Sequence, residues 1–314
     1  MSATDNIRRG IVNLFSRNMS RRQAAMSGIN WIMKRILQAY SSRHIASGRR
    51  QLAVFSYDLI GHWINIDGVF ENEELVTFFE WMKPYRETFS NACAIDVGAN
   101  IGNHSLYFSD FFSSVISIEP NKRAFALLRV NADMVSNMTC HNFGVSSEAG
   151  EAKLIFGADN VGGARISPST SCLAGERIPL RTLDSVASHV ENIKLVKIDV
   201  EGHEYQVLLG ATEVIRKNRP IIIFEQLKSE FGAGTTPVID LLAKSGYSRF
   251  AIVQKHPVPP IWAHRYIGYV YSAIVSVVWG ASMRVTIRGK ISHASYAFIV
   301  ALPEWVAINT HVRR

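Results

Sequence analysis

The chain has 314 residues, of which 47% are hydrophobic and 19% charged, and its formal net charge is +8. This apolar content excludes a disordered protein, and the length suffices for one large domain with an extension. The three cysteines, Cys93, Cys140 and Cys172, show neither a paired framework nor a metal-binding spacing, so we expect a reducing cytoplasmic compartment.

The positive charge is concentrated in residues 1–50, which hold ten Arg or Lys residues against one acid and so carry +9, whereas the remainder sums to −1. Apolar side chains recur among the arginines at helical spacing: Ile11, Leu14, Phe15, Trp31, Ile32, Ile36 and Leu37. The pattern predicts an amphipathic helix on an anionic membrane surface. The alternatives are a solvated or protein-docking arm, a transit peptide and nonspecific nucleic-acid binding. The arm lacks the continuous apolar stretch of a secretory signal.

An apolar segment from Cys93 to Val97 is followed by a turn with two glycines, Gly98 and Gly102, and then by a helical pattern over 103–112. This order predicts a buried strand, a tight turn and a helix. Because glycine lacks a Cβ, a ligand can approach the backbone of such a turn closely. A glycine turn alone can also serve only to change the direction of the chain.

A second apolar strand ends in Glu119 and Pro120, about twenty residues after the turn, where a doubly wound sheet places a carboxylate against a ribose diol. The turn lacks the middle glycine that makes room for a pyrophosphate, and Asp96 would repel one but suits the amino group of a methionine moiety. The sequence therefore predicts S-adenosylmethionine as the cofactor. The expected binding residues lie in the turn and at strand ends: Asp96, Gly98, Asn100, Gly102, Glu119, Pro120 and Asn142.

Residues 144–184, between the third and fourth predicted strands, are rich in glycine and serine. We expect a loop with a small hairpin there. A substrate lid and a surface excursion are the two interpretations.

A further apolar strand runs into four ionisable side chains within six residues, which are more than helix capping needs: Asp199, Glu201, His203 and Glu204. A helical pattern over 205–215 and a strand ending in Glu225 follow. His203, whose ordinary pKa is best suited to neutral pH, is the first candidate for a general base, and Asp199 is the second. With Asp184 and Glu225 converging, a divalent metal is an alternative, but carboxylates at this spacing do not define one, so no metal is predicted.

Residues 266–283 carry no charge and reach the lower length limit of a membrane span. A span would separate the strand predicted near residue 297 from its sheet. The two interpretations are therefore contact with a membrane, and packing inside the protein or at a dimer interface. A dimer interface would make the protein a homo-oligomer.

Taken together, residues 59–225 resemble the FkbM-type S-adenosylmethionine-dependent methyltransferases. The matching segments, in the family's order, are Gly68-Val69-Phe70-Glu71, Asp96 to Gly102, Ile118 to Asn121, Thr182-Leu183-Asp184 and Lys197 to Glu204. The resemblance implies a class I methyltransferase fold, an α/β doubly wound, mostly parallel sheet of about seven strands with an antiparallel last hairpin. The strands are expected near 93–97, 115–119, 139–143, 194–199, 221–225, 249–253 and 296–301.

The predicted organisation is a basic arm (1–50), a helical lead-in (51–90) and an FkbM-like domain (91–314). The resemblance implies methylation of a hydroxyl on a sugar, a glycan or a similar secondary metabolite, and the acceptor would be lipid-linked if both ends of the chain touch a bilayer. The expected location is the cytoplasm, at the inner face of the membrane. The remaining candidates for substrate contact are Glu71, Asp184, Glu201, Glu204 and Glu225.

Two other classes of function are weighed against this one. A nicotinamide-dependent oxidoreductase would need a turn that accepts pyrophosphate and a Tyr-x-x-x-Lys pair, and no convincing pair is found. A noncatalytic membrane-docking protein would be expected to have lost Asp96, Glu119 or the Asp199 turn, all of which are present. No specific nucleic-acid partner is expected.

Overall fold

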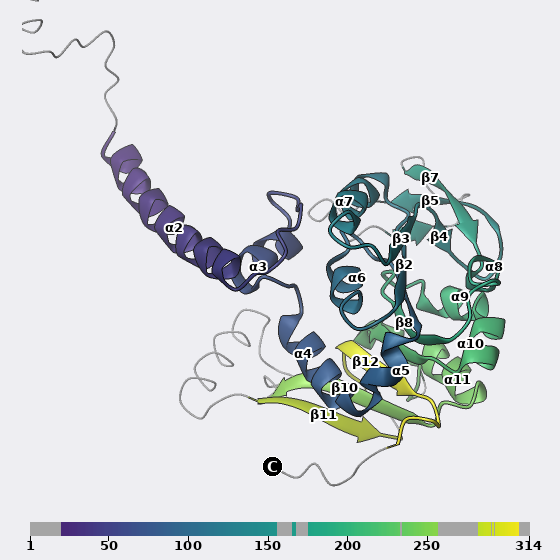
Figure 1. Ribbon diagram of the computed structural model, residues 1–314. Coiled ribbons are helices and arrows are strands. Elements are labelled where there is room, and N and C mark those ends of the chain that lie inside the picture. Colours follow the sequence, from purple (N-terminus) through teal and green to yellow (C-terminus); the bar gives the residue numbers. More distant parts are fainter. Residues whose placement is uncertain are drawn as a thin grey trace, which may run out of the picture. The chain divides into compact units, whose positions relative to one another are not determined.

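The computed structural model describes residues 20–155, 165–167, 175–232, 234–256, 282–289, 291 and 293–307 (Figure 1). The chain divides into two compact units, Met1–Arg49 and Arg50–Arg314. Within the described residues, no helix combines the length and the apolar character that crossing a membrane requires.

The described part of the first unit is mainly one long helix, α2 (Arg21–Ala46). A capping box starts it, because the hydroxyl of Ser20 accepts a hydrogen bond from the amide of Gln23, whose side chain accepts one from the amide of Ser20. None of the side chains of this helix is buried.

The second unit is built on an eight-stranded sheet with the order β11-β10-β12-β9-β8-β1-β2-β3. The strands are β1 (Cys93–Val97), β2 (Ser114–Ile118), β3 (Met138–His141), β8 (Ile193–Ile198), β9 (Ile221–Gln226), β10 (Arg249–His256), β11 (Ser282–Arg288) and β12 (Tyr296–Leu302). The five strands from β3 to β9 are parallel, and β12 runs antiparallel to both β9 and β10. The class I methyltransferase fold is thus confirmed.

The number of strands differs from the prediction of about seven. All seven predicted strands are present, and β11 adds an eighth at the edge by pairing antiparallel with β10. The side chains of β11 are partly or fully exposed, and polar residues alternate with apolar ones. The strand therefore lacks the buried apolar run of a central strand such as β1 or β9.

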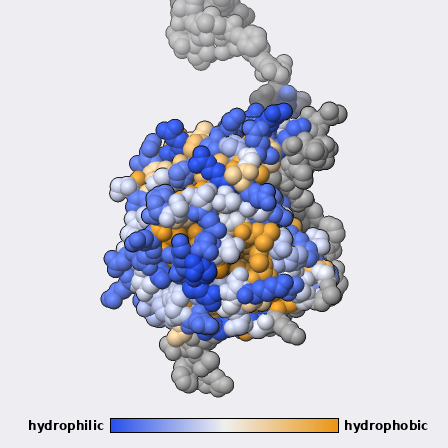
Figure 2. All heavy atoms as spheres, turned by 90° about the vertical axis from the view of Figure 1, so that its right-hand side faces the viewer, coloured by the Kyte–Doolittle hydropathy of each residue, from blue (hydrophilic) through white to orange (hydrophobic). Residues whose placement is uncertain are grey.

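Helices cover both faces of the sheet because successive strand residues point to opposite sides. On one face, α4 (Asn72–Trp81), α5 (Arg86–Ser90) and α6 (Asn103–Phe108) pack over a core that includes Ala94 and Leu195. The other face, over Ile95 and Val196, carries four helices from the C-terminal half of the chain: α8 (Leu183–Val186), α9 (Glu204–Leu209), α10 (Thr212–Asn218) and α11 (Pro237–Lys244). Figure 2 shows the side of the molecule that carries these helices, which is mostly hydrophilic with a few apolar areas.

Four further elements complete the described helices of this unit. They are α3 (Leu59–Asp67), α7 (Lys122–Ala132) and two 3-10 turns, Lys83–Tyr85 and Lys228–Glu230. Asn121 caps α7, because its side chain accepts a hydrogen bond from the amide of Arg123.

The segment between β3 and β8 is more ordered than the loop with a small hairpin that its composition predicts. Its described residues form a second sheet with the order β4-β7-β5-β6, made of β4 (Gly144–Val145), β5 (Gly150–Ile155), β6 (Arg165–Ser167) and β7 (Glu176–Arg181). A small core of Ala152, Leu154 and Ile178 supports this sheet. Residues 156–164 and 168–174 of this segment lie outside the described residues, and a substrate lid or a surface excursion stays a prediction.

The helix predicted over 205–215 is instead two helices, α9 and α10, separated at Gly210 and Ala211. A Cβ on Gly210 would lie 2.1 Å from the carbonyl oxygen of Ser146. The backbone of the insertion thus approaches the chain too closely for any other residue at this position. Of residues 266–283, only Ser282 and Met283 are described, and both belong to β11.

Candidate functional site

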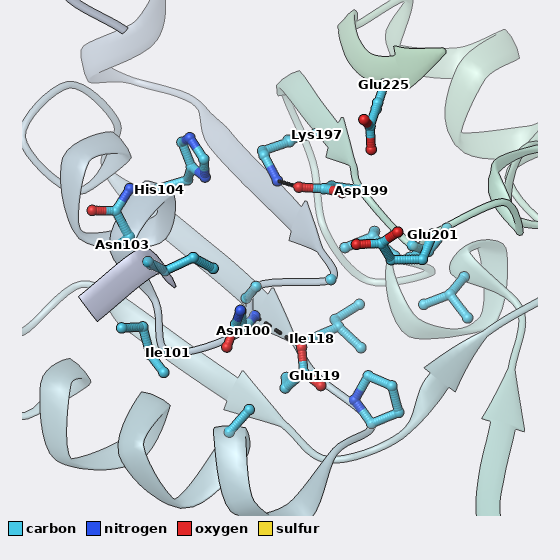
Figure 3. A pocket seen from close by; sticks show the side chains of 18 of the residues that line it. Asn100, Ile101, Asn103, His104, Ile118, Glu119, Lys197, Asp199, Glu201 and Glu225 are labelled. Carbon is cyan, nitrogen blue, oxygen red and sulfur yellow. Dashed lines mark hydrogen bonds and ion pairs between the residues drawn. The ribbon is translucent and has the colours of Figure 1, made fainter. Parts of the chain in front are cut away.

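A cavity of about 350 Å³ lies where the carboxyl ends of β1, β2, β8 and β9 meet (Figure 3). This is the edge at which open α/β sheets bind their ligands. Helix α3 and the insertion add apolar walls through Leu59, Ile60 and Leu154. The polar lining consists of Glu71, Asn100, Asn103, His104, Glu119, Lys197, Asp199, Glu201 and Glu225.

The glycine turn after β1 forms one wall of this cavity. Gly98 has a φ of 84°, and a Cβ at this position would lie 1.8 Å from the carbonyl oxygen of Asp199. Only glycine fits there, because the turn packs directly on the end of β8. Gly102 also has a positive φ, 90°, but it faces Leu128 of α7 and does not line the cavity.

The carboxylate of Glu119 is held between two backbone amides. Asn100 and Asn121 each donate a hydrogen bond of 2.8 Å to it, one to each oxygen. Burial raises the pKa of Glu119 to about 7, although the two amides lower it. Pro120 lines the cavity, whereas Asn142 lies behind it and donates to the carbonyl oxygens of Glu119 and Pro120.

Lys197 is a buried cation that the sequence analysis missed. Its Nζ lies 3.0 Å from Oδ2 of Asp199 and 3.7 Å from Oδ1 of Asp96. Burial would lower the pKa of Lys197, but the two carboxylates raise it above its ordinary value. The pKa of Asp199 is lowered in return, because the attraction to Lys197 outweighs burial. The lysine is thus charged, and Asp199 is ionised.

Asp96 is fully buried and lies one layer behind the cavity wall. Besides Lys197, it contacts Ser105, whose hydroxyl donates a 2.6 Å hydrogen bond to it. Asp96 is thus not part of the cavity lining, where the expected contact with the amino group of a cofactor would lie, but its charge raises the pKa of both Lys197 and Glu119.

Glu71 and His104 form a second polar pair on the cavity wall. His104 Nε2 lies 3.0 Å from Glu71 Oε2, and Glu71 has a left-handed backbone with a φ of 55°. Asn103 fixes this segment, because its side chain exchanges two hydrogen bonds with the backbone of Phe70. Neither His104 nor Asn103 was predicted, although both belong to the helix that follows the glycine turn.

The ionisable groups of the acidic turn separate into two sets. Asp199 and Glu201 line the cavity, whereas His203 and Glu204 do not. His203 Nε2 lies 3.0 Å from the hydroxyl of Ser146, and burial lowers its pKa. The carboxylate of Glu204 accepts the amides of Val200 and Gly202 and so shapes the turn itself.

The fold places two further predicted residues, Asp184 and Glu225, in different parts of the molecule. Asp184 caps α10 by accepting the amides of Glu213 and Val214, away from the cavity. Glu225 lines the cavity, and its pKa is raised to about 7 by burial, then by the carboxylates of Asp199 and Glu201. Within the described ranges, no group of three or more His, Cys, Asp or Glu side chains is arranged to hold a metal ion.

The cavity fits S-adenosylmethionine in three respects. The buried Glu119 carboxylate is fixed where a ribose would bind, and the glycine turn lines the cavity next to it. The lining carries more carboxylates than cations, which suits a positively charged sulfonium. The volume lies in the range of small-molecule sites. The sheet order is that of the class I methyltransferase fold.

The family follows from comparison of the sequence. Residues 96–249 match the family model of the methyltransferase FkbM domain. This match confirms the resemblance found in the sequence, and a family of this kind uses S-adenosylmethionine as its cofactor.

Among characterised proteins, the chain is similar to the hexuronic acid methyltransferase AglP of Haloferax volcanii, with 29% identity over 156 residues, which are 49% of this chain and 62% of that protein. Among solved structures, it resembles a methyltransferase FkbM from Methylobacillus flagellatus KT, with 17% identity, a TM-score of 0.31 and coverage of 60% of this chain and 47% of the other. A precorrin-6y C5,15-methyltransferase from Geobacter metallireducens GS-15 is 10% identical, with a TM-score of 0.38 and coverage of 73% and 86%. The chain thus spans less than two thirds of the first two relatives.

Proposed function

We propose that this protein transfers a methyl group from S-adenosylmethionine to a hydroxyl of a sugar or glycan. The observation that carries the proposal is the division of one cavity into two ends. Glu119 and the glycine turn form a nucleoside end, and the carboxylates at the ends of β8 and β9 form an acidic end. The similarity to a hexuronic acid methyltransferase supports a sugar as the acceptor class.

At the nucleoside end, we assign the ribose to Glu119 and the backbone around Gly98 and Asn100, with Pro120 beside them. Asp96, Gly102 and Asn142 support these groups from behind the wall. Lys197, held by Asp96 and Asp199, is close enough to the cavity to bind the carboxylate of a methionine moiety.

At the acidic end, we assign the acceptor to Glu71, Asp199 and Glu201. Methyl transfer is an in-line displacement, so most of the rate comes from holding the hydroxyl against the methyl group. Ionised carboxylates accept hydrogen bonds from sugar hydroxyls and can orient them. When bound, S-adenosylmethionine supplies an activated methyl group on a sulfonium.

The first test is calorimetric titration of the purified full chain with S-adenosylhomocysteine, with NAD as the comparison. We expect micromolar binding of S-adenosylhomocysteine and none of NAD, and methyl transfer from a labelled donor to members of a panel of methyl glycosides. Binding of NAD alone would favour the oxidoreductase. A folded protein that binds neither would favour the noncatalytic docking protein.

We further propose that α2 binds an anionic membrane surface, which would place the enzyme at the cytoplasmic face of a membrane. Large apolar residues are exposed along most of its length: Met26, Ile29, Trp31, Ile32, Met33, Ile36, Leu37 and Ile45. The helix contains five Arg or Lys residues and no acid, which complements anionic lipid.

This second proposal predicts that the full chain sediments with vesicles that contain phosphatidylserine and not with neutral vesicles. Deleting residues 1–50 should reduce sedimentation and leave the affinity for S-adenosylhomocysteine unchanged. Complete sedimentation of the truncated protein would show that α2 is not the membrane anchor.

A further inference from the structure

Glu225 differs from the other acids of the cavity because its carboxylate has no hydrogen-bond or ion-pair partner among the described residues. It is the fifth residue of β9, next to β8 in the sheet, and it lines the cavity beside Asp199. Figure 3 shows its carboxylate pointing toward Asp199 and Glu201. Within the described part of the chain, it makes no hydrogen bond and no ion pair.

The other candidate bases are engaged. Asp199 lies 3.0 Å from the ammonium of Lys197, which holds it ionised and lowers its affinity for a proton. Both oxygens of Glu119 accept backbone amides, and Glu71 lies 3.0 Å from His104. His203 contacts Ser146 and lies outside the cavity lining.

We propose that Glu225 is the general base that removes the proton from the acceptor hydroxyl, an assignment that rests on the proposed function above. The acceptor oxygen forms a bond to the methyl carbon as the sulfur–carbon bond breaks, and that bond's electron pair stays on sulfur. The hydroxyl proton passes to the free oxygen of Glu225 and then to water. Asp199 is a positioning group that accepts a hydrogen bond from the acceptor.

The surroundings of Glu225 suit this role. Burial raises the pKa of Glu225, and four carboxylates raise it further: Asp199, Glu201, Glu204 and Glu71. The cation Lys197 and the titratable His104 also line the cavity. The resulting pKa of about 7 matches a base that works near neutral pH. Its unprotonated form is needed, so turnover should fall as the pH drops below this value.

The principal test is Glu225→Gln in the full chain, assayed with labelled S-adenosylmethionine and the methyl glycosides that the wild type methylates. We expect kcat to fall by about 100-fold or more, the usual contribution of a general base. The Kd for S-adenosylhomocysteine should stay within twofold, and the fall of kcat at acid pH should disappear. Glu213→Gln, on the exposed surface of α10, is the matched control and should change neither quantity.

The outcomes separate the two proposals. A variant that binds S-adenosylhomocysteine normally and turns over like the wild type would overturn the assignment, as would a folded variant that loses cofactor binding. A wild-type protein that does not bind S-adenosylhomocysteine would overturn the proposed function itself.

A second measurement does not need an acceptor or an active variant. With ¹³C-labelled glutamate, nuclear magnetic resonance should show two carboxyls that titrate near neutral pH. One should be absent in Glu225→Gln and the other in Glu119→Gln. If no signal near neutral pH is lost in Glu225→Gln, Glu225 does not have the proton affinity that the base requires.

Discussion

The backbone amide of Asn100 donates a 2.8 Å hydrogen bond to the carboxylate of Glu119. This bond joins the glycine turn after β1 to the end of β2, so the two sequence features form one structural unit. Asn100 adopts a left-handed backbone conformation in this turn, with a φ of 50°. The carboxylate therefore orients the turn.

Replacing Glu119 should weaken cofactor binding. We expect Glu119→Gln to raise the Kd for S-adenosylhomocysteine by about 10- to 100-fold, because hydrogen bonds to a charged group contribute about 1.5–3 kcal/mol each. Calorimetry measures the effect, and Glu213→Gln on exposed α10 is the control. An unchanged Kd would show that the ribose does not bind at Glu119.

Gly98 should tolerate no side chain. Gly98→Ala would place a Cβ 1.8 Å from the backbone of Asp199 at a φ of 84°. We expect a loss of about 2 kcal/mol or more in the free energy of unfolding, with loss of S-adenosylhomocysteine binding, because backbone must move. Gly150→Ala is the matched control, since nothing lies within 4 Å of its Cβ position. Urea denaturation compares the two, and equal stability would contradict this packing.

Lys197 should be needed for folding stability because it neutralises two carboxylates. Lys197→Met leaves Asp96, which is fully buried, without its cation, so we expect a loss of about 3–5 kcal/mol in the free energy of unfolding. The double variant Asp96→Asn with Lys197→Met should recover part of this loss. Strictly additive losses, measured by urea denaturation, would show that the two side chains do not interact.

The sequence predicted the fold better than the site. The central strands β1, β8 and β9 are largely buried and mostly apolar, and such runs are visible without a structure. In contrast, β11 is a half-exposed edge strand that needs its partner β10 to be recognised. The division of the helix over 205–215 depends on contact between Gly210 and Ser146, which are distant in sequence. No local pattern reports such a contact.

At the site, the sequence identified residues at the ends of strands, but it did not predict which of their side chains point into the cavity. Asp199 and His203 are four positions apart in one turn, yet only Asp199 lines the cavity. Lys197 precedes Asp199 by two positions, so both side chains point to the same side of the strand. That periodicity was the available signal for the Lys197–Asp199 pair, and it was missed because a lysine within an apolar strand was not considered as a buried cation.

Glu225 should reduce stability at neutral and higher pH. Its pKa is raised to about 7, so between about pH 4.5 and 7 the folded protein binds more protons than the unfolded chain, and stability falls as the pH rises. Glu225→Gln should therefore be more stable than the wild type at about pH 8, by about 1–3 kcal/mol, and equally stable at about pH 4, below the ordinary pKa of the group. Urea denaturation at both pH values provides the comparison. Equal stability at both would show that the carboxylate is well solvated.

The charge of the acceptor should decide how well it is methylated. Five carboxylates line the cavity, Glu71, Glu119, Asp199, Glu201 and Glu225, and the cation Lys197 is held by Asp199 and Asp96. A sugar that carries its own carboxylate would meet repulsion at the acidic end, so an uncharged glycoside should have a kcat/KM at least about tenfold higher than the matching uronic acid, a difference of about 1.4 kcal/mol. The difference should shrink in Glu201→Gln and at high salt, because both weaken the repulsion. Labelled methyl transfer to the paired acceptors measures the ratio, and preference for the uronic acid would place the acceptor away from these carboxylates.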